Sequence, residues 1–327
     1  MKSGFSIAMC TYNGSSFLPE QLESIAAQTR LPDELVICDD RSSDGTAALI
    51  EEFAARTPFP VRLVVNGSTL GSTKNFENAI SRTQHEVIVL ADQDDVWYPD
   101  KLERMEQVFA RSKDVVAAFS DADIIDDRSK SLGKLLWASF SFSANEQQTF
   151  SDGHALDVLV KHWVVTGATM AFRREWLGVL LPMPASDVHD RWISFLLAAC
   201  GPITPISEPL MQYRRHHGQQ IGAGASTFQA RLARAGITGE SRYQSDIDRF
   251  LDLKARLEFF RSVIPDAERG IREVENKIAH LQHRIGVRRM RLNRIPNVVR
   301  EVCNRGYWRY AAGWESVAKD LFLYGPK

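Results

Sequence analysis

Carboxylates gather directly after two short apolar runs of the sequence. Asp92-Gln93-Asp94-Asp95 follows the run Val87–Leu90, and Asp39-Asp40 follows Leu35–Cys38. Three carboxylates within four residues repel one another when all are ionised, so the cluster needs a countercharge. A hard cation such as Mg²⁺ or Mn²⁺ supplies one, since it binds carboxylate oxygens and leaves other positions to substrate phosphates. The alternative is a solvated acidic turn, because Asp is common after strands.

The second carboxylate pair opens a segment that runs into a helix. The segment is Asp39-Asp40-Arg41-Ser42-Ser43-Asp44-Gly45-Thr46. Asp44 is a candidate helix N-cap, and Gly45 suits a turn. Two Asp residues at a strand end exceed what capping requires. We therefore expect one of them to accept a hydrogen bond from a nucleobase or a ribose, with solvation of the other as the alternative.

The elements that position these carboxylates alternate between apolar runs and amphipathic stretches. The amphipathic stretches are Phe17–Gln28 and Thr46–Ala55, and each places its apolar residues on one helical face. The apolar runs are Phe5–Cys10, Leu35–Cys38, Val61–Val65 and Val87–Leu90. This alternation predicts a parallel sheet with helices on both faces, and such sheets bind ligands at the carboxyl ends of their strands. Thr11-Tyr12-Asn13 follows the first run and should lie at that edge.

The later part of the chain has a looser pattern. We expect helices at Pro99–Arg111 and Asp152–His162, and strands at Val115–Ser120 and Gly167–Arg173. From Thr227 onward the sequence is charged and helical. Its predicted helices are Ser245–Val263, Asp266–Arg284 and Pro296–Leu323, with Pro265 and Pro296 as breaks.

Composition excludes several classes of protein. The 44% hydrophobic and 25% charged residues are typical of a globular chain, and the four scattered cysteines form no zinc-ligand spacing. No apolar stretch approaches the roughly 18 to 20 residues that span a bilayer, and the first apolar run is too short for a signal peptide. The net charge of −1 hides an asymmetry, because residues 254–327 carry 16 Lys and Arg against 8 Asp and Glu. We expect an acidic body and a basic tail.

Four segments together resemble glycosyltransferase family 2, which has the GT-A fold. They are Thr11-Tyr12-Asn13-Gly14, the segment from Asp39 to Thr46, Leu70-Gly71-Ser72-Thr73-Lys74-Asn75, and Ala91-Asp92-Gln93-Asp94-Asp95. The resemblance spans about residues 1–225 and implies an α/β, Rossmann-like catalytic domain with a mostly parallel sheet. It places a nucleotide-sugar half at about residues 1–113 and an acceptor half at about 114–225. Residues 226–327 would then form a basic helical C-terminal extension.

The resemblance implies a set of residues that bind the nucleotide-sugar. Asp39 or Asp40 would face the base, and Asp92 would face the ribose in a DxD motif whose Asp94 binds Mg²⁺ or Mn²⁺. The other residues implied in nucleotide-sugar binding are Thr11, Tyr12, Asn13, Lys74 and Gln93. The segment Ala91–Trp97 is similar to that of bacterial members that build rhamnose- or galactose-containing surface polysaccharides.

The acceptor side carries a second set of residues. Asp190, in His189-Asp190-Arg191-Trp192, holds the place of the family's general base, with Asp187 as the second candidate. The alternative is a purely structural role, in which Asp190 caps a helix over Arg191–Ala199. Further residues implied near the sugars are Asp95, Trp97, Gly167, Arg191 and Trp192.

A last segment, Tyr213 to Gly222, is similar to the family's Tyr-Arg-x-His segment. Its histidine approaches the metal or the diphosphate in that family, and two adjacent histidines, His216 and His217, compete for the role here. We favour His216. Arg214 and the neighbouring Gly-containing loop suit a diphosphate better than a core.

The resemblance implies an inverting glycosyltransferase that uses dTDP-rhamnose or a UDP-hexose and a glycan or lipid-linked acceptor. Alternatives are a non-catalytic nucleotide-sugar-binding scaffold and, less favoured, a sugar nucleotidyltransferase; a dinucleotide oxidoreductase lacks its Gly-rich turn. In the tail, residues 281–309 hold eight arginines among apolar residues, with Glu301 as the sole acid. This mixture is typical of a helix on anionic lipid, although packing on protein is an alternative. We expect a cytoplasmic protein, peripheral on the inner membrane face or homo-oligomeric, that binds no nucleic acid.

Overall fold

The computed structural model describes residues 3–216, 240–290 and 294–322. These residues divide into two compact units. The first holds the chain up to Gly153 and resumes at Val164, and the second holds His154–Trp163 together with the helices from Glu240 onward. Each unit is described separately below.

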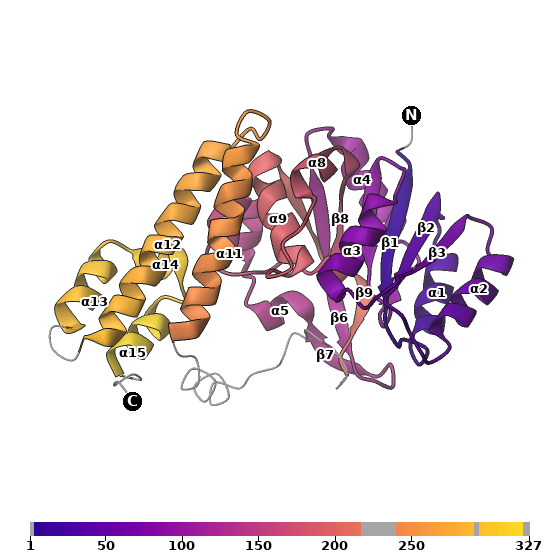
Figure 1. Ribbon diagram of the computed structural model, residues 1–327, viewed down its shortest axis with the longest axis horizontal. Helices are drawn as coiled ribbons and strands as arrows, with labels where there is room; N and C mark the ends of the chain where they lie inside the picture. The colour runs from indigo at the N-terminus through magenta and orange to yellow at the C-terminus, as the bar shows by residue number, and fades with distance from the viewer. Residues whose placement is uncertain (1–2, 217–239, 291–293, 323–327) are drawn as a thin grey trace. The chain divides into compact units, whose positions relative to one another are not determined.

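The first unit is built on one mixed sheet with the strand order β3-β2-β1-β4-β8-β6-β9-β5, and β7 pairs with β6 (Figure 1). Its strands are β1 (Phe5–Thr11), β2 (Glu34–Asp39), β3 (Val61–Val65), β4 (Val87–Ala91), β5 (Val96–Trp97), β6 (Ala117–Ile125), β7 (Ser131–Leu135), β8 (Met170–Arg173) and β9 (Ile203–Arg214). The first four strands run parallel, as their nearly all-apolar sequences predict. The strands β8 and β5 pair antiparallel with their neighbours, and β9 lies parallel to β6.

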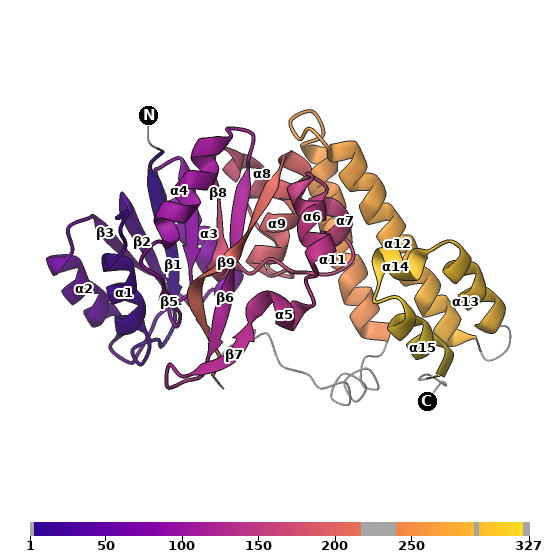
Figure 2. The ribbon, with the colours of Figure 1, turned by 180° about the vertical axis from the view of Figure 1, so that it is seen from behind.

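Helices cover both faces of this sheet. The main helices are α1 (Leu18–Ala26), α2 (Thr46–Arg56), α3 (Ser72–Ser81), α4 (Lys101–Arg111) and α9 (His189–Cys200). One core joins α1, α2 and α4 to the sheet residues Ile7, Ile37 and Val89, and Figure 2 shows α1 and α4 in front of the sheet. The helices α3 and α9 cover the opposite face (Figure 1). Shorter helices complete the unit: α5 (Leu136–Phe140), α6 (Ala144–Ser151) and α8 (Leu177–Leu180).

Some local predictions are corrected by the structure. Gly45, with φ at 91°, is the N-cap of α2, and Asp44 lies one residue earlier with its Oδ1 accepting the Thr46 N–H at 3.1 Å. The predicted helix over residues 152–162 is only α7 (Ala155–Leu159). The predicted strand over residues 167–173 begins with the 3₁₀ turn η1 (Gly167–Thr169) before β8.

The second unit is helical. The long helices α11 (Glu240–Phe259) and α12 (Ala267–Arg289) pack side by side, with Pro265 in the turn between them as predicted. The predicted single helix over Pro296–Leu323 is wrong, because three helices occur there. They are α13 (Arg294–Cys303), α14 (Gly306–Tyr310) and α15 (Trp314–Phe322). Arg305 and Gly313 adopt positive φ angles of 58° and 56°, which an α-helix does not accommodate.

Asp320 is the charged centre of the helical unit. Its side chain is fully buried, and Arg284 donates to it through Nε at 2.6 Å and through a terminal nitrogen at 3.0 Å. The Tyr307 hydroxyl donates to the same carboxylate at 3.0 Å. This carboxylate therefore ties together α12, α14 and α15.

We expect Asp320→Ala to destabilise the helical unit by about 3–5 kcal/mol, because it leaves the buried Arg284 guanidinium without its partner. Urea unfolding followed by tryptophan fluorescence measures the loss. Glu315→Ala removes an ion pair with Lys319 whose side chains are 33% and 22% exposed. This control should cost no more than about 1 kcal/mol, and an equal cost for both variants would contradict the central role of Asp320.

Candidate functional site

The carboxyl ends of β1 and β2 lie together, as the predicted parallel sheet requires. Thr11 and Asp39 are register partners, and the Thr11 hydroxyl donates to Asp39 Oδ1 at 2.7 Å. The Ser42 hydroxyl donates to the same oxygen at 2.6 Å, and its backbone N–H donates to Oδ2 at 2.8 Å. Asp39 therefore fixes this end of the two strands. Its Oδ1 accepts two hydrogen bonds, whereas its Oδ2 accepts one.

Asp40 fixes the loop that enters α3. Its Oδ1 accepts the backbone N–H of Leu70 at 2.7 Å and the side-chain amide of Asn66 at 2.9 Å. Its Oδ2 accepts the Gly71 N–H at 2.9 Å. Both carboxylates of the pair are buried. Each one holds a loop by hydrogen bonds, in addition to the ligand contact that the sequence predicts for one of them.

The segment after β1 is held by the side chain of Gln93. Gln93 accepts the Tyr12 N–H at 2.8 Å and donates to the Tyr12 carbonyl at 3.1 Å. Gly14 lies so close that an added Cβ would meet Gln93 Oε1 at 2.2 Å. Asn13 has a φ of 47° and accepts the Ser43 N–H at 2.9 Å. The structure thus brings Tyr12, Asn13 and Gln93 to one edge, and Tyr12 is 47% exposed there.

The acidic loop, residues 92–95, lies at the carboxyl end of β4. Asp94 Oδ2 lies 2.8 Å from His216 Nε2, so the structure brings together the two predicted metal ligands. Asp95 is fully buried; one oxygen accepts the Arg214 N–H at 3.0 Å and the other has no hydrogen-bond partner among the described residues. His217 lies outside the described residues.

The pKa values of the acidic loop reflect an unbalanced negative charge. Burial raises the pKa of Asp92, and the charges of Asp94 and Asp190 raise it further. Burial also raises the pKa of Asp95, with Asp94 and Asp92 acting in the same direction. A cation placed among these oxygens would reverse these shifts. The carboxylates and His216 therefore suit a divalent cation.

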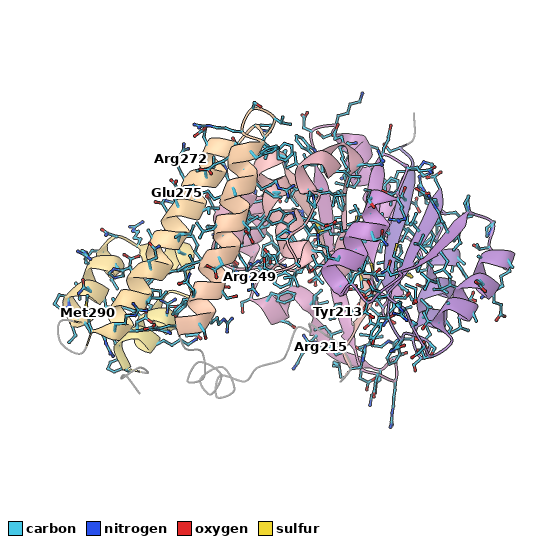
Figure 3. All side chains as sticks on the ribbon, viewed as in Figure 1. Tyr213, Arg215, Arg249, Arg272, Glu275 and Met290 are labelled. Carbon is cyan, nitrogen blue, oxygen red and sulfur yellow. The ribbon has the colours of Figure 1, made fainter. Side chains whose placement is uncertain are left out.

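Arg214 faces the protein interior. Its side chain is 1% exposed, its Nε donates to the Asp94 carbonyl at 2.7 Å, and a terminal nitrogen donates to the Ser129 hydroxyl at 2.8 Å. The guanidinium also forms an ion pair with Glu20. Arg214 thus braces the acidic loop from behind. Its N–H groups donate to protein atoms, whereas the sequence suggested a diphosphate as their partner. Figure 3 labels its neighbours Tyr213 and Arg215.

Lys74 is also bound within the protein. Its Nζ donates to the Met183 carbonyl at 2.6 Å and to Glu77 Oε2 at 2.8 Å. Glu77 in turn accepts the Met183 N–H at 2.7 Å, and the Thr73 hydroxyl donates to the Asp187 carbonyl. The start of α3 therefore anchors the loop that leads into α9.

Asp190 lies in the first turn of α9, whose N-cap is Val188. The alternative that Asp190 caps this helix is therefore wrong. Asp190 Oδ2 accepts the Gly167 N–H at 3.1 Å, and Oδ1 accepts the Arg191 N–H at 2.8 Å. Burial raises the pKa of Asp190 to about 7, and the charge of Asp187 acts in the same direction. At neutral pH this carboxylate is poised to take a proton.

Gly167 allows the turn η1 to approach α9. An added Cβ would meet His189 Nε2 at 2.6 Å and Asp190 Cβ at 3.4 Å. Asp187 is paired instead with Arg191, whose Nε lies 2.9 Å from Asp187 Oδ1. Both predicted sugar-facing tryptophans are core residues. Trp97 and Trp192 are 3% and 2% exposed, and the Trp192 indole N–H donates to the Leu180 carbonyl at 2.8 Å.

Comparison with known proteins supports this reading of the fold. The sequence profile described as glycosyl transferase family 2 matches residues 6–181, which is more than half of the chain. The chain belongs to glycosyl transferase family 2. It is 25% identical over 263 residues to the dTDP-rhamnosyl transferase RfbG of Shigella flexneri, covering 76% of this chain and 84% of that protein.

Solved structures show the same fold at low identity. The Staphylococcus aureus protein TarS (residues 1–349), in complex with UDP-GlcNAc, aligns with a TM-score of 0.58 at 15% identity, covering 93% of this chain and 81% of that one. The mannosyltransferase PcManGT of Pyrobaculum calidifontis, in complex with GDP-Man and Mn²⁺, aligns with a TM-score of 0.51 at 17% identity, covering 99% and 85%. The predicted GT-A fold is confirmed.

Several residues of the site were missed from the sequence. Glu20, Ser42, Ser129 and Lys101 all contact predicted site residues or the segments that carry them. Glu20 and Ser129 are far apart along the chain and meet at Arg214, so spacing gave no signal for them. Ser42 stood inside the quoted motif, three residues after Asp39, where a side-chain turn is common.

Proposed function

We propose that this protein is an inverting glycosyltransferase that moves a sugar from a nucleoside diphosphate to an acceptor hydroxyl. The observation that carries the proposal is the Asp190 carboxylate, with a pKa near 7, placed close enough to the acidic loop for its charge to act on Asp92. Similarity to a dTDP-rhamnosyl transferase supports dTDP-rhamnose as the donor, with a UDP-hexose as the second candidate. The acceptor we propose is a glycan or lipid-linked glycan of a surface polysaccharide.

The donor lies, in this proposal, along the edge formed by β1, β2 and β4. Asp39 accepts a hydrogen bond from the base through Oδ2, which has one backbone donor. Thr11, Tyr12 and Asn13 line the nucleotide, and Asp92 contacts the ribose. Asp40 and Gln93 act by holding the loops that form this edge, and Lys74 acts by holding the loop that leads into α9.

Asp94 and His216 would hold Mg²⁺ or Mn²⁺. The described residues contain no group of three His, Cys, Asp or Glu side chains that could hold a metal on their own. Two protein ligands suffice, since diphosphate oxygens and water commonly complete such a site. When bound, the ion would neutralise charge that develops on the departing diphosphate.

Asp190 acts as the general base in this mechanism. Its carboxylate takes the proton of the acceptor hydroxyl while the acceptor oxygen bonds to the anomeric carbon and the bond from that carbon to the diphosphate oxygen breaks. The Gly167 and Arg191 N–H groups hold the carboxylate in place. This single displacement inverts the anomeric centre, so a product with retained configuration would contradict the role of Asp190.

The pKa of Asp190 predicts the pH dependence of the reaction. Only the ionised carboxylate accepts a proton, so kcat/KM should fall about tenfold per pH unit below pH 7 and level off above it. Among the charged groups around Asp190, Asp187 raises its pKa and is itself paired with Arg191. Asp92 is a further neighbour, whose own pKa is raised by the charge of Asp190. A pH profile of initial rates measures this, and a flat profile between pH 5.5 and 7 would contradict it.

Thermal stabilisation by nucleotides tests the function itself. dTDP, UDP, GDP and CMP are each added with and without Mn²⁺, because a ligand at a hundred times its Kd stabilises by about 2.7 kcal/mol. A Mn²⁺-dependent shift with dTDP supports rhamnosyl transfer, and one with UDP supports a hexosyl donor. No shift with any nucleotide would favour a scaffold protein.

The domain roles that we propose follow the sequence division. Residues 1–225 carry catalysis, and residues 226–327 carry contacts with an anionic membrane surface or a second copy. Within the described part of the chain, no helix is both long and apolar enough to cross a bilayer. Helix α13 leaves Ile295 and Val299 67% and 51% exposed on one face, next to Arg300, which suits a lipid surface.

We expect the protein to float with vesicles that contain anionic lipid and to stay behind with zwitterionic vesicles. Ile295→Ser together with Val299→Ser should abolish flotation, because the pair provides the apolar contact. Phe259→Ser, which changes a side chain 81% exposed on α11, is the matched control. Equal flotation with both kinds of vesicle would contradict the membrane contact.

A further inference from the structure

A buried ammonium group lies behind the acidic loop. Lys101, the first residue of α4, is fully buried. Its Nζ donates to the Ala168 carbonyl at 2.7 Å, contacts the Met211 sulfur at 3.3 Å, and lies 4.0 Å from the centre of the Trp97 ring. No carboxylate of the described residues lies within ion-pair distance of this nitrogen. A lysine buried in this way is rare and costly unless a nearby charge compensates it.

The compensating charge comes from the acidic loop. Burial lowers the pKa of Lys101, and the charges of Asp95 and Asp92 act against that effect. Lys101 in turn lowers the pKa of both carboxylates. Its positive charge and the excess negative charge of the loop therefore stabilise each other.

The hydrogen bond of Lys101 leads to the acceptor side of the site. Ala168 belongs to η1, and Gly167 of the same turn donates its N–H to Asp190 Oδ2. Met211 belongs to β9, which carries Arg214 and leads to His216. One ammonium group thus contacts the turn that holds Asp190 and the strand that leads to the predicted metal ligand.

We propose that Lys101 is a positioning residue: it is the internal countercharge of the acidic loop and the anchor of the η1 turn beside Asp190. This inference rests on the proposed function for the roles of Asp94 and Asp190. A cation bound by Asp94 would meet the positive charge of Lys101, so Lys101 weakens cation binding while it holds the site in shape. A residue that serves packing alone would have no such opposing effect.

Two variants separate charge from anchoring. Lys101→Met removes the charge and the hydrogen bond, whereas Lys101→Gln removes the charge and keeps an N–H donor for the Ala168 carbonyl. Lys113→Met, an exposed lysine just beyond α4, is the matched control. Binding of Mn²⁺ alone is measured by electron paramagnetic resonance, and amide hydrogen exchange is followed in peptides that span residues 164–170.

We expect both Lys101 variants to bind Mn²⁺ about tenfold more tightly than the unchanged protein, since a like charge has been removed nearby. Exchange in residues 164–170 should be faster in Lys101→Met and unchanged in Lys101→Gln, while Lys113→Met alters neither measurement. If circular dichroism shows that Lys101→Met does not fold, the affinity for Mn²⁺ is tested with Lys101→Gln alone.

Unchanged or weaker Mn²⁺ binding in the Lys101 variants would overturn the countercharge role. Unchanged exchange in Lys101→Met would overturn the anchoring role. If the unchanged protein binds no Mn²⁺, the metal site of the proposed function fails, and hydrogen exchange still decides whether Lys101 holds the turn. The two failures are therefore distinguishable.

Discussion

Asp190→Asn should lower kcat by about 10²- to 10⁴-fold while the affinity for the nucleotide stays within about twofold. The amide cannot take the acceptor proton, but it occupies the same space and retains an oxygen for the Gly167 or Arg191 N–H. Rates of nucleoside diphosphate release, together with nucleotide binding by calorimetry, measure the two effects.

Stability separates this loss of activity from a loss of fold. The native pKa of Asp190, about 7, lies above its unfolded value, so the ionised carboxylate destabilises the folded state above pH 7. Asp190→Asn should therefore melt no lower than the unchanged protein at pH 8. Asp187→Asn is the comparison, because it breaks the buried pair with Arg191 and should reduce stability. A larger loss of kcat in Asp187→Asn would assign the base to Asp187.

Asp94→Ala should reduce kcat/KM by at least about 10²-fold and abolish tight Mn²⁺ binding, since it removes a ligand that His216 alone does not replace. The charge of Asp94 raises the pKa of both Asp92 and Asp95. Its removal should therefore leave the melting temperature unchanged or higher. Activity titrated with Mn²⁺, together with Mn²⁺ binding to the protein alone, measures the effect.

Asp100→Asn is the matched control for Asp94→Ala. Asp100 is exposed near the same loop, at the N-cap of α4, and makes no side-chain capping bond. Its replacement should change neither kcat/KM nor Mn²⁺ affinity by more than about twofold. Full activity of Asp94→Ala in the absence of added metal would contradict the metal-dependent mechanism.

The parallel half of the sheet was predictable from the sequence because its strands are buried on both faces. Short all-apolar runs such as Val87–Leu90 are typical of buried strands in a parallel sheet. The strand β9 was missed, since Pro205, Glu208 and Pro209 interrupt its pattern and its pairing with β6 joins distant parts of the chain. Long-range pairing of this kind leaves no local signal.

The candidate site was predictable where motif residues project from strand ends. Thr11, Asp39 and Asp94 lie where the parallel sheet requires. The direction of a long cationic side chain was not predictable in the same way. Arg214 was expected at a diphosphate, and nothing in the sequence distinguished Lys101 from a surface lysine, because charged side chains are rarely buried. Only the fold shows that Arg214 braces the acidic loop from within and that Lys101 binds the η1 turn.

Helix α7 belongs to the helical unit although it interrupts the sequence of the first unit. Its residues Leu156 and Leu159 are buried, and Asp157 pairs with Arg269 of α12 at 3.0 Å. A single crossover between two related genes near residue 225 would therefore combine an α7 from one parent with an α12 from the other. The C-terminal helices can therefore be exchanged between related proteins only together with α7. Sequence changes in one of these two segments should be matched by sequence changes in the other.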